Sequence, residues 1–198
     1  MTKYLITPSL INSFQYYIKD EWKSPEDSRA DFLRTLSRER FQPNEAMQKG
    51  IDFENKIEAW CNGSDNNDLI VNEIGDIVKG GLWQESCKKD LTIGGNNFIL
   101  YGRCDVVKGD TIYDIKYTKR YDVGKFQDSI QHLIYLYCLD LPNFSYLVSD
   151  GKDFWREDYS NNNEVENVIK SKISDFLDYL DNDDEAKSLF KNNWKNKY

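Results

Sequence analysis

The sequence GRCDVVKGDTIYDIK, residues 102–116, predicts a tight β-hairpin. Runs of strand-forming residues flank Gly109-Asp110, a dipeptide suited to the positive φ angles of a two-residue turn. With this turn, Asp105 lies opposite Asp114, and Lys116 follows Asp114 on the same face of its strand. Directly opposed carboxylates repel each other. The hairpin therefore gathers two acids beside one lysine, a cluster that a divalent cation would neutralise.

A helix predicted over residues 44–61 adds a third acid before the hairpin. Glu54 lies in the middle of a helical stripe formed by Met47, Gly50, Ile51, Ile57 and Cys61. A buried carboxylate without a partner is unfavourable or becomes protonated. Glu54 is therefore expected to share a metal ion with Asp105 and Asp114, to reach the rim of the stripe, or to pair with a basic side chain.

A second helix, predicted over about residues 123–140, follows the hairpin. Gln131 and Tyr135 are four residues apart and share a face with Ile134 and Cys138 that should pack on the sheet. A glutamine on such a face must find hydrogen bonds. Taken alone, the pair fits a satisfied, half-buried glutamine and a core tyrosine. His132 lies on another face and is expected at the surface rather than as a metal ligand.

Patterning along the rest of the chain predicts an α/β fold in a single domain, residues 1–198. Further helices are expected over residues 7–18, 24–40, 69–79, 163–181 and 184–193. Strands are expected over residues 83–91, 97–107, 111–117, 144–149 and 154–158. The core, about residues 43–158, is thus a helix, three antiparallel strands, a helix and a strand. Helical additions cover residues 7–40 and 163–193.

Composition limits the classes of partner. The chain of 198 residues has a net charge of −8, which argues against strong non-specific binding to nucleic acid. The charge is uneven, because residues 150–185 are strongly acidic whereas residues 103–125 carry more basic than acidic groups. DNA is therefore not excluded. Without a long apolar run or a signal peptide, we expect a cytoplasmic protein, of a bacterial or phage-infected cell, that does not engage membranes.

The cysteines are widely spaced. They are Cys61, Cys87, Cys104 and Cys138, and no Cys-x-x-Cys pair occurs. We expect four ordinary buried or half-buried thiols, with neither a zinc site nor disulfides.

Four short motifs occur in order on the predicted helix, strand, strand and helix. They are Gly50-x-x-x-Glu54, Gly102-Arg-Cys-Asp105, Asp114-Ile-Lys116 and Gln131-x-x-x-Tyr135. Together they resemble the PD-(D/E)xK nuclease superfamily, specifically its RecB-like and phage-type exonuclease branch, over about residues 5–155. The segment Ile6–Phe14 also resembles the opening helix of RecB-like nuclease domains. Asp114 stands where many members have glutamate. Several relatives hold an iron–sulfur cluster, but here no cysteine precedes Cys61 or follows Cys138, so no cluster is expected.

The resemblance implies a restriction-endonuclease-like core and a metal site. Glu54, Asp105, Asp114 and the Ile115 carbonyl would bind one or two Mg²⁺ or Mn²⁺ ions. Lys116 would orient or deprotonate the attacking water, or neutralise charge on the phosphate.

The resemblance also assigns supporting residues. Gln131 would position Lys116, a nucleotide or the water, and Tyr135 would support the site by packing. Lys119, Arg120 and Lys125 would contact DNA phosphates, or are simply solvated charges.

The implied function is a metal-dependent DNA nuclease, most simply an exonuclease in recombination, repair or phage replication. It would act alone, as a homo-oligomer or beside a recombination partner protein. The alternative is a catalytically silent binding module of the same fold, such as a phage-encoded inhibitor or assembly factor. Such a module would use the acidic surface of residues 150–185 to bind a protein.

Overall fold

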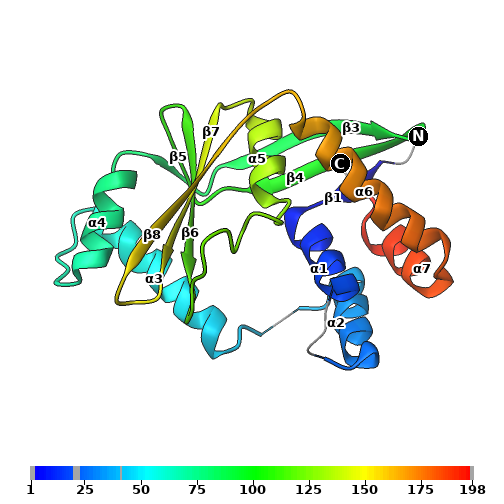
Figure 1. Cartoon of the computed structure of the whole chain (residues 1–198), viewed down its shortest axis with the longest axis horizontal. Helices are drawn as coiled ribbons and strands as arrows, with labels where there is room; N and C mark the ends of the chain where they lie inside the picture. Colours follow the sequence, from blue (N-terminus) through cyan, green and yellow to red (C-terminus); the bar gives the residue numbers. More distant parts are fainter. Residues whose placement is uncertain (1–2, 20–22, 41, 197–198) are drawn as a thin grey trace.

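A computed structural model describes residues 3–19, 23–40 and 42–196 and shows a mixed α/β fold (Figure 1). The first elements are β1 (Tyr4–Ile6), α1 (Pro8–Lys19), α2 (Pro25–Ser37), α3 (Glu45–Cys61), α4 (Leu69–Val78), β2 (Leu82–Trp83), β3 (Ser86–Ile93) and β4 (Asn96–Arg103). The later elements are β5 (Val106–Lys108), β6 (Thr111–Tyr117), α5 (Gln131–Leu139), β7 (Asn143–Ser149), β8 (Phe154–Ser160), α6 (Val165–Asp181) and α7 (Asp184–Asn193). The strands form one sheet in the order β1-β4-β3 and another in the order β2-β5-β6-β7-β8.

One bent ribbon of two strands joins the sheets. Strands β3 and β4 form a hairpin in the smaller sheet, and the same two chain segments continue as β2 and β5 in the larger one. At the bend the Gln84 N–H donates to the Asp105 carbonyl at 2.8 Å, and the Cys104 N–H donates to the Glu85 carbonyl at 2.8 Å. Gln84 has a φ of 56°. The continuous strands expected over residues 83–91 and 97–107 were therefore wrong, because each breaks where it changes sheet.

The hairpin of β5 and β6 has the expected register. Val107 pairs with Ile112, and Gly109 in the turn has a φ of 61°. Strand β7 lies parallel to β6, reached through α5, and β8 closes the sheet antiparallel to β7. The expected core order of helix, antiparallel strands, helix and strand is confirmed.

Local signals explain where three of the helices begin. Side chains of Ser24, Asn44 and Asp183 accept backbone N–H groups in the first turns of α2, α3 and α7. Helix α2 ends at Ser37 rather than near Arg40, because Arg38 adopts a left-handed conformation with a φ of 53°. A strand that the sequence analysis did not predict, β1, pairs parallel with β4.

Helix α5 is shorter than expected. Residues 123–128 form successive turns instead of helix, and Gly124 has a φ of 81°. The helix is capped from a distant segment, because Asn12 of α1 accepts the Ile130 N–H at 3.1 Å and donates to the Ser129 hydroxyl at 3.0 Å. The position of α5 therefore depends on α1.

Two side-chain clusters form the core. Helices α3 and α4 cover one face of the larger sheet through Phe53, Ile57, Val71 and Ile74 (Figure 1). The larger cluster joins the smaller sheet, strands β6 and β7, and helices α1, α2, α5, α6 and α7. Within it, the Trp194 indole N–H donates to the Leu36 carbonyl at 2.9 Å. These contacts join the helical additions at the two ends of the chain.

Two burial predictions were wrong. Met47 and Ile51 of the expected stripe are 49% and 42% exposed, whereas Ile57 of that stripe is buried together with Phe53. His132 is only 4% exposed, because its ring stacks on Tyr159 with centroids 4.0 Å apart. Its pKa falls to about 4 through burial, so the ring is neutral at pH 7.

The cysteines are free thiols, with Cys87 and Cys104 buried and Cys61 and Cys138 half-buried. The Cys104 and Cys138 thiols both contact Cys87, although the three lie far apart in the sequence. Among the described helices, none combines the length and apolar character needed to cross a membrane.

Candidate active site

The bend of the ribbon, strand β6 and helices α3 and α5 bring together the residues singled out from the sequence. Asp114 and Lys116 lie on β6, and Asp105 lies at the bend directly before β5. Glu54 comes from α3, and Gln131 is the first residue of α5. The contacts described below link these residues through hydrogen bonds, an ion pair and their mutual electrostatic effects.

Asp114 is the most buried member of the cluster, with 1% of its surface exposed. Its Oδ1 accepts a hydrogen bond from the Gln131 amide at 2.5 Å, and its Oδ2 forms an ion pair with the Lys116 ammonium. Burial raises the pKa of Asp114, and the Lys116 charge opposes this. Gln131 and Lys116 thus fix both oxygens of one carboxylate.

Asp105 is anchored by the backbone of the facing strand. Its Oδ2 accepts the Ile115 N–H at 2.8 Å. Burial raises the pKa of Asp105 well above its ordinary value, and the Asp114 charge raises it further. Ile115 directs its side chain into the core cluster beneath α3, so it reaches the site only through its backbone.

Glu54 is half-buried, and its Oε1 accepts a hydrogen bond from the Gln84 amide at 2.5 Å. Burial raises the pKa of Glu54, and the Asp114 charge adds to the effect. Gln84 is a residue that the sequence analysis missed. Its positive φ at the bend directs it towards α3, and no pattern in the sequence marks it.

Lys116 is the cationic partner of the three acids. Burial lowers its pKa, but the charges of Asp114 and Asp105 outweigh burial, so the pKa lies above its ordinary value. The amine is therefore protonated at neutral pH. It is also part of the wall of a cleft, which leaves it accessible to a bound molecule.

Tyr135 supports the site by close packing on β4. Its hydroxyl donates to the Arg103 carbonyl at 2.9 Å, two residues before Asp105. A Cβ atom on Gly102 would lie 2.3 Å from the Tyr135 ring, so only glycine permits this approach. Tyr135 thus packs closely on β4 beside the bend that carries Asp105.

The donor set has the chemistry of a site for a divalent cation. Carboxylate and carbonyl oxygens are the ligands that Mg²⁺ and Mn²⁺ prefer. The charges of Asp114 and Glu54 raise the pKa of Asp105, so the three carboxylates form one mutually repelling group. As they stand, no three acidic, histidine or cysteine side chains of the described residues are gathered closely enough to hold a metal ion. To hold an ion, the three carboxylates would have to move closer together than they lie here.

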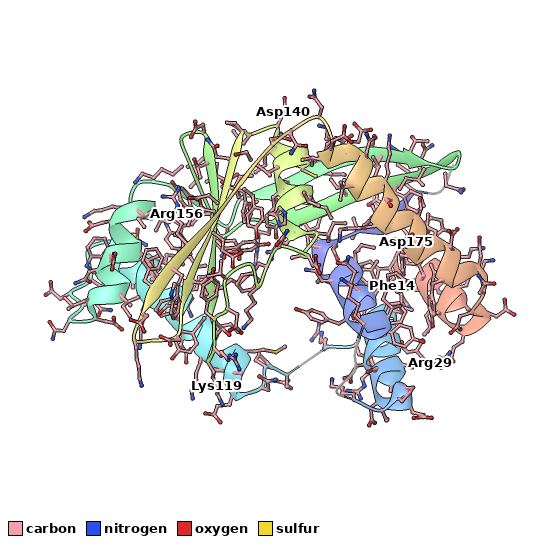
Figure 2. The ribbon with its side chains drawn as sticks, viewed as in Figure 1. Phe14, Arg29, Lys119, Asp140, Arg156 and Asp175 are labelled. Carbon is pink, nitrogen blue, oxygen red and sulfur yellow. The ribbon has the colours of Figure 1, made fainter. Side chains whose placement is uncertain are left out.

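A cleft of about 750 Å³ opens beside this group. Lys116 and Gln131 form part of its wall, together with Lys125 and residues of α1. Of the three basic residues expected to meet phosphates, Lys125 thus lies in the cleft. Lys119 lies near the N-terminal end of α3 instead (Figure 2), and Arg120 is exposed and paired with Asp122.

No family model and no curated protein matches this chain. Among solved structures, the crystal structure of SSO0001 aligns with 89% of this chain and 77% of its own, with a TM-score of 0.58 and 10% identity. The crystal structure of LHK-Exo in complex with dAMP aligns with 94% of this chain and 92% of its own, with a TM-score of 0.53 and 18% identity.

The chain has a restriction-endonuclease-like fold. This fold class matches the resemblance noted from the sequence. It places the hairpin of β5 and β6 in the centre of the larger sheet, between α3 on one side and α5 on the other (Figure 1). Sequence identities this low support an inference about the fold alone. Any inference about activity must come from the chemistry of the site.

Proposed function

We propose that the protein is a metal-dependent DNA nuclease, and specifically an exonuclease that hydrolyses phosphodiester bonds. The observation that carries the proposal is the convergence of Glu54, Asp105 and Asp114 with Lys116 and Gln131. Three acids coupled by charge, beside one protonated amine, are an unfavourable arrangement for a purely structural core. At the edge of a cleft they suit the binding of a divalent cation and a phosphate.

Glu54, Asp105, Asp114 and the Ile115 carbonyl would hold Mg²⁺ or Mn²⁺. When bound, the ion supplies positive charge beside the phosphate and makes a nearby water more acidic. The neighbour LHK-Exo was solved in complex with dAMP, a deoxynucleotide, which supports a DNA substrate by analogy of fold.

The protein's own groups have distinct roles in this proposal. The Lys116 ammonium faces the cleft and offsets negative charge that develops on the phosphate. Gln131 holds Asp114 through one oxygen, so Asp114 keeps its other oxygen directed at Lys116. The Ile115 N–H holds Asp105 in the same way from the backbone. These contacts hold Asp105 and Asp114 at the site in the metal-free protein, and binding of a metal ion would draw the carboxylates closer together.

The direct test is incubation of the purified protein with end-labelled linear DNA and with closed circular DNA, in Mg²⁺, Mn²⁺ or EDTA. We expect Mg²⁺-dependent release of nucleotides from linear DNA, with circular DNA left intact. Asp114→Asn should abolish the activity. Asp76→Asn, which removes an exposed acid on α4, is the matched control.

Absence of cleavage of either DNA in both metals across a range of salt would contradict the proposal. Calorimetry with Mn²⁺ then separates the alternatives. Metal binding that is lost in Asp105→Ala, without any hydrolysis, would favour the silent binding module.

A further inference from the structure

The cleft beside Lys116 extends well beyond the acidic group. A second hollow, of about 920 Å³, shares Asn12, Tyr16 and Lys23 with the first. It continues along α1 and α2 to Asn44 and Met47 at the start of α3. The two hollows form one groove, which we call the α1 groove, leading from the start of α3 along α1 to Lys116.

Basic side chains outnumber acidic ones along the α1 groove. The basic residues are Lys19, Lys23, Arg34, Arg40, Lys116 and Lys125. The acidic residues are Asp31, Glu39 and Asp128. This excess stands out in a chain with a net charge of −8. A polyanion would therefore be drawn to this groove rather than to the rest of the surface.

The ion pairs of Lys19 and Lys23 in the α1 groove are exposed to solvent, whereas Lys116 is held by the buried Asp114. Lys19 contacts Asp128 at 2.9 Å, but the two side chains are 58% and 81% exposed. Exposed pairs of this kind are weak and easily exchanged for a phosphate. Lys125 donates to the Thr118 hydroxyl and the Arg120 carbonyl, and both of these acceptors are neutral groups.

An exposed aromatic ring stands in the same wall. Tyr16 is 77% exposed although it lies on α1 in the shared part of both hollows. Phe126 lines the groove from the segment before α5. An aromatic side chain in a basic groove can stack on the face of a nucleic-acid base. In a duplex, the faces of the bases are already covered by the neighbouring base pairs. An unpaired strand is the form of DNA that can use both features at once.

We propose that the α1 groove binds single-stranded DNA, with Tyr16 stacking on a base and Lys19, Lys23 and Lys125 contacting phosphates. The strand would run along α1 and present one phosphate to Lys116. The claim that this phosphate is cleaved rests on the function proposed above. The claim that the groove binds a single strand does not depend on that function. The substrate would then be a single strand or the frayed end of a duplex.

The first experiment measures binding in EDTA, where no metal-dependent cleavage occurs, by fluorescence anisotropy of a labelled single strand and a blunt duplex. The single strand should bind more tightly. Tyr16→Ala should raise its Kd by at least about 5-fold, since stacking on one aromatic ring is worth that much. Tyr16→Phe should retain most of the affinity. Tyr101→Ala, at an exposed tyrosine on β4, should not change the Kd.

The second experiment follows the salt dependence of the same binding. Each phosphate contact on a single strand adds about 0.7 to the slope of log Kd against log salt. Lys125→Ala should lower the slope by about that amount. Lys88→Ala, at an exposed lysine on β3, is the matched control and should leave it unchanged.

The outcomes separate the two proposals. Loss of single-strand affinity in Tyr16→Ala supports the inference even if no DNA is hydrolysed. The inference would be overturned if the protein bound both DNA forms equally and if Tyr16→Ala and Lys125→Ala bound DNA like the wild type. If DNA were hydrolysed in that case, the nuclease proposal would still stand. Circular dichroism of each variant shows that the fold is retained.

Discussion

The Asp105 carboxylate lies where its negative charge is disfavoured. Burial comes first and the charge of Asp114 second, and together they raise its pKa well above the usual 3.8. Between pH 3.8 and that raised pKa, the folded protein holds a proton that the unfolded chain releases. The free energy of unfolding therefore falls as pH rises through this window. Above the raised pKa, Asp105 is ionised in both states and the loss of stability reaches its full value.

Asp105→Asn should consequently stabilise the metal-free protein at pH 8. The amide oxygen of asparagine can still accept the Ile115 N–H, and each unit of upward pKa shift corresponds to about 1.4 kcal/mol. Thermal unfolding in EDTA should show a higher Tm for the variant, with the difference shrinking towards pH 4. Excess Mg²⁺ should stabilise the wild type more than the variant. A variant less stable than the wild type at pH 8 would contradict this account.

Lys116 provides the second test at this scale. Lys116→Ala should lower kcat by roughly 100-fold or more, a typical loss when one group that stabilises transition-state charge is removed. Initial rates on end-labelled DNA in saturating Mg²⁺ measure the effect. Lys88→Ala serves as the control for loss of one positive charge. A rate within a few-fold of the wild type would remove Lys116 from the mechanism.

The acids and the lysine of the hairpin could be placed from the sequence because they lie close together along the chain. Asp105, Asp114 and Lys116 share one hairpin whose turn is encoded by Gly109, so their faces follow from strand alternation alone. Gln84 was not predictable, because its contact with Glu54 depends on a bend between two sheets. His132 was misplaced because its burial depends on Tyr159, a residue of β8.

At the scale of elements, helix α5 can pack closely on β4 because Gly102 has no side chain. Gly102→Ala would bring a Cβ atom to 2.3 Å from the Tyr135 ring, which is itself only 4% exposed. We expect a loss of about 1–3 kcal/mol, the usual range for overpacking, and a lower nuclease rate because Gln131 lies on the same helix. Urea unfolding and initial rates measure the two effects.

Gly50 offers the matched control for this substitution. It lies inside α3, and a Cβ atom there would meet nothing within 4 Å. Gly50→Ala should therefore stabilise the protein by up to about 1 kcal/mol through helix propensity. If both alanine variants had the same stability, the packing argument for Gly102 would fail.

Element boundaries were predictable where the signals are local. The caps at Ser24, Asn44 and Asp183 mark helix starts correctly. Residues 123–129 were misassigned as helix because apolar spacing outweighed the turn-forming Gly124. The segments 83–91 and 97–107 were each expected to form one strand, but each contributes strands to two different sheets. Local sequence does not reveal this, because it depends on how the whole ribbon bends.

At the scale of the whole molecule, the helices from both ends of the chain pack together. Helix α2 contacts α7, and Arg29 pairs with Asp183 at 2.9 Å. We therefore propose that residues 1–198 unfold as one domain. Urea unfolding followed by tryptophan fluorescence and by circular dichroism should give coincident single transitions. Two separated transitions would show that the helical additions are independent of the core.

Trp194 is the most specific test of this coupling. It is 4% exposed and its indole N–H bonds to the Leu36 carbonyl. Trp194→Ala should destabilise the protein by about 3–5 kcal/mol, as is typical for large-to-small core changes, and should shift the whole transition. Partial melting of the C-terminal helices, with the remaining transition unmoved, would contradict the single domain.

The contacts of Asn12 also bear on how such a protein can diverge. Asn12 bonds to both Ser129 and the Ile130 N–H, directly before the residue that holds Asp114. A substitution at position 12 alone would loosen the start of α5, so it should persist only when position 129 or its loop changes as well. In an alignment of relatives, positions 12 and 129 should therefore co-vary, although they lie 117 positions apart in the sequence.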